Sequence, residues 1–215
     1  MKTRIISIIT LFAFIVSGCG FWGVRGNGHI KEETRSVSDF TKIEAGGAFT
    51  LKINVGPSTS LTISAEENLL KYIRTTVRGN TLKIDTKKNL SPRKEIYIEI
   101  TTPSLNYIEA SGANNISVYG IDNSEFVADL SGAGSIYLTG VTDRFRADLS
   151  GAGSITAKEL KAKDVRISVS GAASADVYAT EYLEASVSGV GSISYYGNPV
   201  KTKTDVSGIG SISRR

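Results

Sequence analysis

The chain of 215 residues contains one cysteine, Cys19, and one histidine, His29. A single cysteine cannot form a disulfide within the chain. With its one histidine near the N-terminus, the body cannot hold a Ser-His-Asp site, and no familiar zinc cluster can be assembled. The phosphate-binding pattern GxxxxGK[ST] is also absent. We therefore expect no catalytic residues, no metal and no cofactor.

Only one long apolar run occurs, over residues 5–16, and it follows Lys2 and Arg4. The run is too short for a comfortable membrane span and is typical of an export signal. It ends in VSGC, which resembles the lipobox of bacterial lipoproteins and implies lipidation of Cys19. We expect a signal peptide over residues 1–18 and a membrane anchor at Cys19. Gly20 follows in place of the aspartate that commonly retains such lipoproteins in the inner membrane, which favours an outer-membrane lipoprotein of the cell envelope, periplasmic or surface-exposed.

Charge of one sign is not in excess. The formal net charge is +4 and falls to +2 when Lys2 and Arg4 leave with the signal peptide. This near balance gives no argument for a nucleic-acid partner.

Helical periodicity is scarce, and residues 65–73 (AEENLLKYI) form the one plausible helix. Residues 19–38 lack an apolar period, so we expect a flexible tether after the anchor. From Phe40 onward, short runs alternate apolar with polar residues, which predicts half-buried strands. Arg78-Gly79-Asn80 is expected to form a tight turn between two of them. The composition therefore predicts a nearly all-β body.

A repeat fills residues 111–213. Its serine-glycine pairs are separated by 20, 19, 20, 18 and 19 residues, and the motifs in order are SGANNI, SGAGSI, SGAGSI, SGAASA, SGVGSI and SGIGSI. A weaker copy begins at Ile43, where IEAGGAFTLKI parallels IEASGANNISV from Ile108. A steady period near twenty residues without helices predicts a solenoid of short parallel strands.

Three columns of the repeat are expected to face the interior. They are the residues before each serine (Leu130, Leu149, Val169, Val187, Val206), after each glycine (Ala113, Ala133, Ala152, Ala172, Val190, Ile209), and three places further on (Ile116, Ile136, Ile155, Ala175, Ile193, Ile212). The glycines are expected at corners that need positive φ or close stacking.

The order of lipobox, DFTKIEAGGAFTLKI, EENLLKYI and stacked SGxGSI motifs resembles the bacterial auto-transporter adhesins with a head GIN domain, formerly a domain of unknown function. The resemblance covers residues 39–213. It implies a right-handed parallel β-helix similar to pectin lyase folds. From the strand pattern and the repeat, we expect an irregular β-rich half at 39–110 and the repetitive half at 111–213. The resemblance carries no catalytic residues and implies a non-enzymatic adhesin.

Two aspartates, Asp129 and Asp148, precede their motifs by two residues and should stack in adjacent rungs facing outward. Asp205 has the same position, whereas Ser168 and Ser186 interrupt the column. Paired carboxylates are also the acid and base of many polysaccharide-cleaving sites. A carbohydrate-active enzyme is therefore an alternative, as is a purely structural envelope scaffold.

Four tyrosines, Tyr119, Tyr137, Tyr178 and Tyr196, fall on or near strand positions that should face solvent. Aromatic rings on a flat β-surface can stack on sugars or anchor protein contacts. We therefore predict a surface that binds a glycan or a surface protein. The last motif leaves an incomplete rung, so weak self-association is expected unless Arg214 and Arg215 oppose it.

Overall fold

The computed structural model describes residues 23–215, and the expected signal peptide and Cys19 lie outside this range. The N-terminal half contains β1 (Val24–Arg25), β2 (Ile30–Thr34), β3 (Lys42–Gly47), β4 (Thr50–Val55), β5 (Ser60–Glu66), α1 (Glu67–Leu70), β6 (Ile73–Arg78), β7 (Thr81–Thr86), β8 (Leu90–Ser91) and β9 (Tyr97–Thr102). The repetitive half contains β10 (Tyr107–Gly112), β11 (Asn115–Leu130), β12 (Ser135–Leu149), β13 (Ser154–Val169), β14 (Ser174–Val187), β15 (Ser192–Tyr196), β16 (Lys201–Val206) and β17 (Ser211–Arg214).

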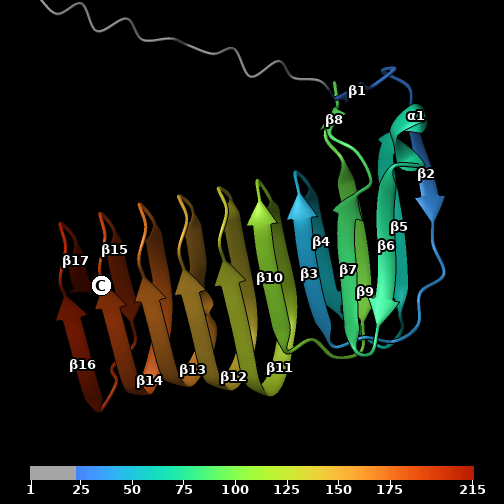
Figure 1. Cartoon of the computed structure of the whole chain (residues 1–215). Coiled ribbons are helices and arrows are strands. Elements are labelled where there is room, and N and C mark those ends of the chain that lie inside the picture. The colour runs from blue at the N-terminus through green and yellow to red at the C-terminus, as the bar shows by residue number, and fades with distance from the viewer. Residues whose placement is uncertain (1–22) are drawn as a thin grey trace, which may run out of the picture.

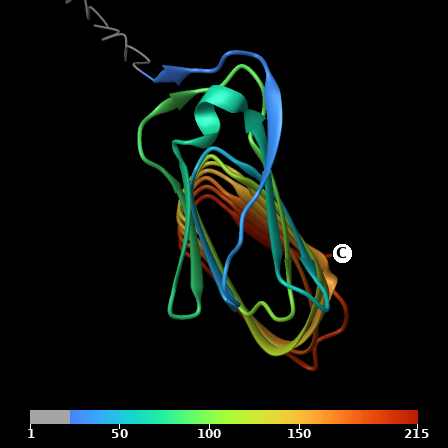
Figure 2. The same cartoon turned by 90° about the vertical axis from the view of Figure 1, so that its right-hand side faces the viewer.

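The strands form a parallel β-solenoid of about five turns with about 20 residues in each rung, which confirms the predicted architecture. Figure 1 shows the rungs stacked side by side, and Figure 2, along the stack, shows a flattened cross-section. Face A consists of β6, β7, β3, β10, the second halves of β11–β14, and β16. Face B consists of β2, β5, β9, β4, the first halves of β11–β14, β15 and β17. Within residues 23–215 no helix is long and apolar enough to cross a membrane.

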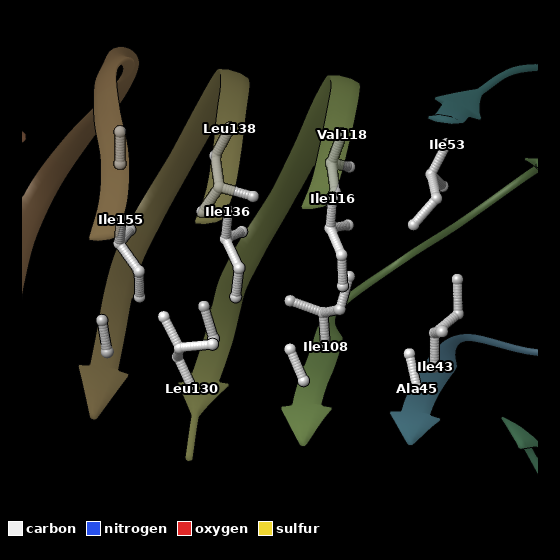
Figure 3. Packing of buried hydrophobic residues seen from close by; sticks show 14 of the residues in the cluster. Ile43, Ala45, Ile53, Ile108, Ile116, Val118, Leu130, Ile136, Leu138 and Ile155 are labelled. Atoms are coloured by element: carbon white, nitrogen blue, oxygen red, sulfur yellow. The ribbon is translucent and has the colours of Figure 1, made fainter. Parts of the chain in front are cut away.

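The interior consists of aliphatic ladders in which each side chain lies on its copy in the next rung. Ile116, Ile136 and Ile155 are partners in register and are buried, and Figure 3 shows them in one row. The column that ends in Val206 is likewise buried until that residue, which belongs to the last rung of its face and is 43% exposed. Burial of each such side chain contributes about 1.5–3 kcal/mol. Two of the three predicted interior columns are therefore confirmed.

The third predicted column is wrong. The residues after the motif glycines face solvent, and Val190 and Ile209 are 63% and 82% exposed. The chain turns at the motif, so the strict alternation of a strand does not continue through it. The following position faces the interior instead, and there Asn114 and Ala173 are buried. The alanine column therefore forms an exposed ridge along the corner.

Close stacking explains the first glycine of the motif. A Cβ added to Gly151 would overlap the carbonyl oxygen of Gly132 in the rung below, and the same clash recurs through the column. That carbonyl accepts a hydrogen bond from the backbone N–H of Ala152 at 3.1 Å. Most of these corners have ordinary φ, and a positive φ of 95° occurs at Gly112. Of the two predicted reasons for glycine, close backbone approach is the general one.

The solenoid begins earlier in the chain than residue 111. β3 pairs with β10 in parallel, with Ile43 beside Ile108 and Gly47 beside Gly112. The weak repeat predicted at Ile43 is therefore a true rung. The intervening strands β5, β6, β7 and β9 extend the stack on the other side of β3 and β4. Buried Asn114 joins the two parts, because its side chain hydrogen-bonds Phe49 N, Ala45 O and Ser111 O.

The N-terminal end of the solenoid is covered by antiparallel strands and α1 (Figure 2). Gly79, with φ of 57°, begins the tight turn that joins β6 to β7, as predicted. The fully buried Glu66 accepts hydrogen bonds from the backbone N–H groups of Gly28, Arg93 and Lys94. Burial alone would raise the pKa of this carboxyl, but these hydrogen bonds outweigh it and lower the pKa below its usual range.

Part of the expected tether is folded onto this end. β1 pairs with β8, and β2 pairs with β5. Gly26 lies so close to Glu66 that a Cβ would overlap the carboxylate. Arg35 joins the two faces, since its guanidinium donates to Ile73 O at 2.8 Å and to Leu70 O at 3.0 Å. The segment has little apolar periodicity because backbone and polar contacts hold it in place.

The C-terminal end is built differently. Its outermost strands, β16 and β17, are parallel to their neighbours and carry polar residues at inward positions. Thr202 lies beside Leu183, Thr204 beside Ala185, and Arg214 beside Tyr195. These three inward positions of the last rung are therefore polar, whereas Val206 and Ile212 continue their aliphatic columns into it.

Candidate binding surfaces

Face A carries a column of outward carboxylates. Asp129 and Asp148 are partners in register, as predicted, and both are half-buried. The column continues toward the N-terminal end through Glu109 and Glu44. The Nε atom of Arg146 lies 3.3 Å from Asp148 Oδ2. Four carboxylates therefore follow one another at the rung spacing of about 4.8 Å.

Tyr107 organises the middle of this column. Its hydroxyl donates to Asp129 Oδ2 at 2.8 Å and also lies 3.2 Å from Glu109 Oε2. Burial, followed by the nearby carboxylates, raises the pKa of the Tyr107 hydroxyl. Burial also raises the pKa of Asp129, and the charges of Asp148 and Glu109 act in the same direction. Within residues 23–215 no group of three or more His, Cys, Asp or Glu side chains is arranged to hold a metal ion.

The serine groove begins where this column loses its carboxylates. Ser168 and Ser186 form its floor, and Asp148 and Asp205 lie at its two ends. The depression has a volume of about 560 Å³ and spans β12, β13, β14 and β16. Because the floor side chains are short and their neighbours in the same rungs are long, the sheet surface becomes concave here.

Paired charges form the wall of the serine groove. Glu184 is the central group: Lys203 Nζ lies 2.7 Å and Arg166 Nε 3.5 Å from its carboxylate. The Tyr182 hydroxyl lies 3.3 Å from Glu184 Oε2. The hydrogen bond from Lys203 is the main cause that lowers the pKa of Glu184. The wall is therefore a connected network of donors and acceptors that face solvent.

The four predicted tyrosines lie on face B, opposite the serine groove, in two pairs. Tyr119 and Tyr137 come from β11 and β12 and meet edge to face, with ring centroids 5.9 Å apart. Tyr178 and Tyr196 are partners in register on β14 and β15. Tyr119 is 38% exposed, and the other three are half-buried. β13 separates the pairs, so the four rings do not form one continuous patch.

The family description "putative auto-transporter adhesin, head GIN domain" matches residues 39–199. The chain belongs to this family. Membership supports an adhesin of the cell envelope or surface and a non-enzymatic role. The comparison with curated proteins gives no match.

Solved structures of similar fold support the architecture of this head GIN domain. A putative adhesin from Bacteroides fragilis is 24% identical, with a TM-score of 0.73, and the match covers 90% of this chain and all of the other. A putative adhesin from Parabacteroides merdae is 20% identical, with a TM-score of 0.58 and coverage of 90% and 99%. A putative lipid binding protein from Parabacteroides distasonis is 23% identical, with a TM-score of 0.57 and coverage of 89% and 99%.

Several surface residues of the head GIN domain were not predicted from the sequence. Glu44 and Glu109 could have been found, because they occupy the same place in the two aligned segments IEAGG and IEASG. The serine groove could not, since Ser168 and Ser186 look like interruptions until the side chains around them are placed. His29 lies in the folded N-terminal segment, and its carbonyl accepts a hydrogen bond from Glu67 N at 2.8 Å.

Proposed function

We propose that this protein is a lipid-anchored cell-envelope adhesin whose head binds a glycan through the serine groove. The observation that carries the proposal is the groove itself: a concave surface on a rigid sheet, lined by convergent polar side chains. Ligand sites are commonly concave and fix their ligand with a few placed polar groups. Arg166 and Glu184 offer the planar donors and acceptors that hydroxyl groups of sugars can use in pairs.

The anchor is proposed from the lipobox, which ends at Cys19. Incorporation of an alkyne-labelled fatty acid into the wild type, and its loss in Cys19→Ser, would support the anchor. Equal labelling of both chains would contradict it. Separation of inner and outer membranes, followed by protease treatment of whole cells, would test the outer-membrane location and distinguish the periplasmic from the exposed side.

The binding role is tested with the full-length protein in detergent micelles on a glycan array. We expect binding by the wild type and at least tenfold weaker binding by Arg166→Ala and by Glu184→Ala. A parallel assay for released reducing ends separates binding from cleavage. Turnover that requires Asp129 and Asp148 would replace the proposal with a carbohydrate-active enzyme, and neither binding nor turnover would favour a structural scaffold.

A surface protein bound through face B is the second candidate. The edge-to-face pair of Tyr119 and Tyr137 favours it, because paired, partly exposed aromatic rings are typical anchors of protein contacts. If face B binds the partner, cells that carry Tyr119→Ser with Tyr137→Ser should adhere less than wild-type cells. If the serine groove binds it, their adhesion should not change. Tyr178→Ser with Tyr196→Ser tests the other pair in the same assay.

A further inference from the structure

The serine groove presents one pair of outward polar side chains on each of four neighbouring strands. The pairs are Arg146 with Asp148 on β12, Arg166 with Ser168 on β13, Glu184 with Ser186 on β14, and Lys203 with Asp205 on β16. Adjacent strands of a sheet lie about 4.8 Å apart. A ligand that lies along the solenoid axis therefore meets a polar pair at each such step.

The charges of these pairs compensate one another. Three cations (Arg146, Arg166 and Lys203) accompany three carboxylates (Asp148, Glu184 and Asp205). Each cation lies within 3.5 Å of a carboxylate oxygen, at Asp148 or Glu184. A polyanion would have to displace these contacts and would meet a carboxylate at each end of the groove. The charge distribution therefore favours an uncharged ligand rich in hydroxyl groups.

The spacing selects the kind of polymer. An extended peptide advances about 3.3–3.4 Å per residue, which does not match the rung distance. Each pyranose ring of a β-1,4-linked chain advances the chain by about the distance between neighbouring rungs. Its hydroxyl groups both donate and accept hydrogen bonds. We infer that the serine groove binds an uncharged, linear β-1,4-linked glycan along the solenoid axis, with one sugar ring over each of four rungs. This inference rests on the proposed glycan-binding function and names its ligand class.

The inference is tested by calorimetric titration of the full-length protein in detergent micelles. The neutral probes are cello-oligosaccharides and fully N-acetylated chito-oligosaccharides of increasing length. The charged counterpart with the same linkage is a series of β-1,4-linked mannuronate oligomers. Affinity for a neutral series should increase with each ring up to four and then level off. The mannuronate oligomers should bind at least tenfold more weakly than the neutral chain of equal length.

A matched pair of variants tests the location. Ser168→Asp with Ser186→Asp fills the floor with the side chain that Asp129 and Asp148 already place in the same column, so the fold should tolerate it. This variant should bind the neutral four-ring oligomer at least tenfold more weakly. Ser194→Asp is the control on face B, where its partner in register is Asp176, and it should bind like the wild type.

The outcomes separate this inference from the proposed function. Binding on the array to branched, terminal or acidic sugars only, or a neutral series whose affinity levels off at one ring, would overturn the linear neutral ligand while the adhesin proposal stands. An equal loss of affinity in Ser194→Asp would show that the serine groove is not the binding site. No glycan bound in either assay would overturn both. Circular dichroism and the unfolding midpoint of each variant exclude a loss of fold as the cause.

Discussion

The two ends of the solenoid protect their edges in different ways. At the N-terminal end, antiparallel strands and α1 cover the interior, and the buried carboxylate of Glu66 and the guanidinium of Arg35 hold the backbone around them. At the C-terminal end the parallel stack continues to its last strand, and Thr202 and Thr204 replace aliphatic side chains at two inward positions of β16. The first solution depends on specific buried hydrogen bonds, the second on a gradual loss of hydrophobicity. Single substitutions should therefore be costly at the first end and mild at the second.

The largest effect is expected for Glu66→Ala. It leaves the N–H groups of Gly28, Arg93 and Lys94 without their acceptor, so we expect the free energy of unfolding to fall by about 3–4 kcal/mol. Urea unfolding followed by circular dichroism measures this. Glu67→Ala is the matched control, because its carboxylate forms an exposed ion pair with Lys31 and should contribute less than about 0.5 kcal/mol. Similar losses in both variants would contradict the assigned role.

The same substitution in two rungs sharpens the comparison. Gly151→Ala places a methyl group against the carbonyl of Gly132 inside the stack and should cost about 2–3 kcal/mol. Gly208→Ala makes the equivalent contact with Gly189, but its rung has no described rung beyond it, so it can shift and the cost should stay below about 1 kcal/mol. Thermal unfolding of both variants measures these costs. Ala152→Val on the exposed ridge is the control and should leave the stability unchanged. Equal costs would mean that the last rung is as rigid as the middle.

Acid should loosen the N-terminal end selectively. The pKa of Glu66 is lowered in the folded state, so its contribution is present above the unfolded-state pKa of about 4.3 and is lost as the pH falls through the lower folded-state pKa. Hydrogen exchange should increase first in β1, β2 and β8, while the middle rungs stay protected. In Glu66→Gln this pH dependence should disappear. Uniform exchange along the solenoid would argue against a local cause.

The smallest effect on stability is expected at the other end. Thr202→Val with Thr204→Val should change the free energy of unfolding by less than about 0.5 kcal/mol. It restores an aliphatic surface to the last rung, so sedimentation should detect more self-association than in the wild type. Deletion of Arg214 and Arg215 should act in the same direction. Monomers at high concentration in all three proteins would show that neither feature guards this end.

Most of the fold could be predicted from the repeat. Its period predicted the rungs, and the columns of Leu130 and Ile116 predicted the interior because alternation within a strand is strict. The prediction failed at the single position after each motif glycine, where the chain turns and alternation no longer applies. The burial of Glu66 could not be predicted, since a glutamate before a short helix is usually solvated. The serine groove depends on which side chains are long in neighbouring rungs and on the contacts among them, which a single column does not reveal.

The pairing of β3 with β10 has a consequence for the order of folding. Ile43 and Ile108 are 65 residues apart, whereas each later rung stacks on one that is 18–20 residues away. Loop closure over a longer segment costs more entropy, and distant contacts slow folding. The C-terminal rungs should therefore form early, and the N-terminal rung should dock late. Pulse-labelled hydrogen exchange during refolding should protect β12 and β13 before β3. The N-terminal end, which is synthesised first, would then be the last part of the solenoid to fold.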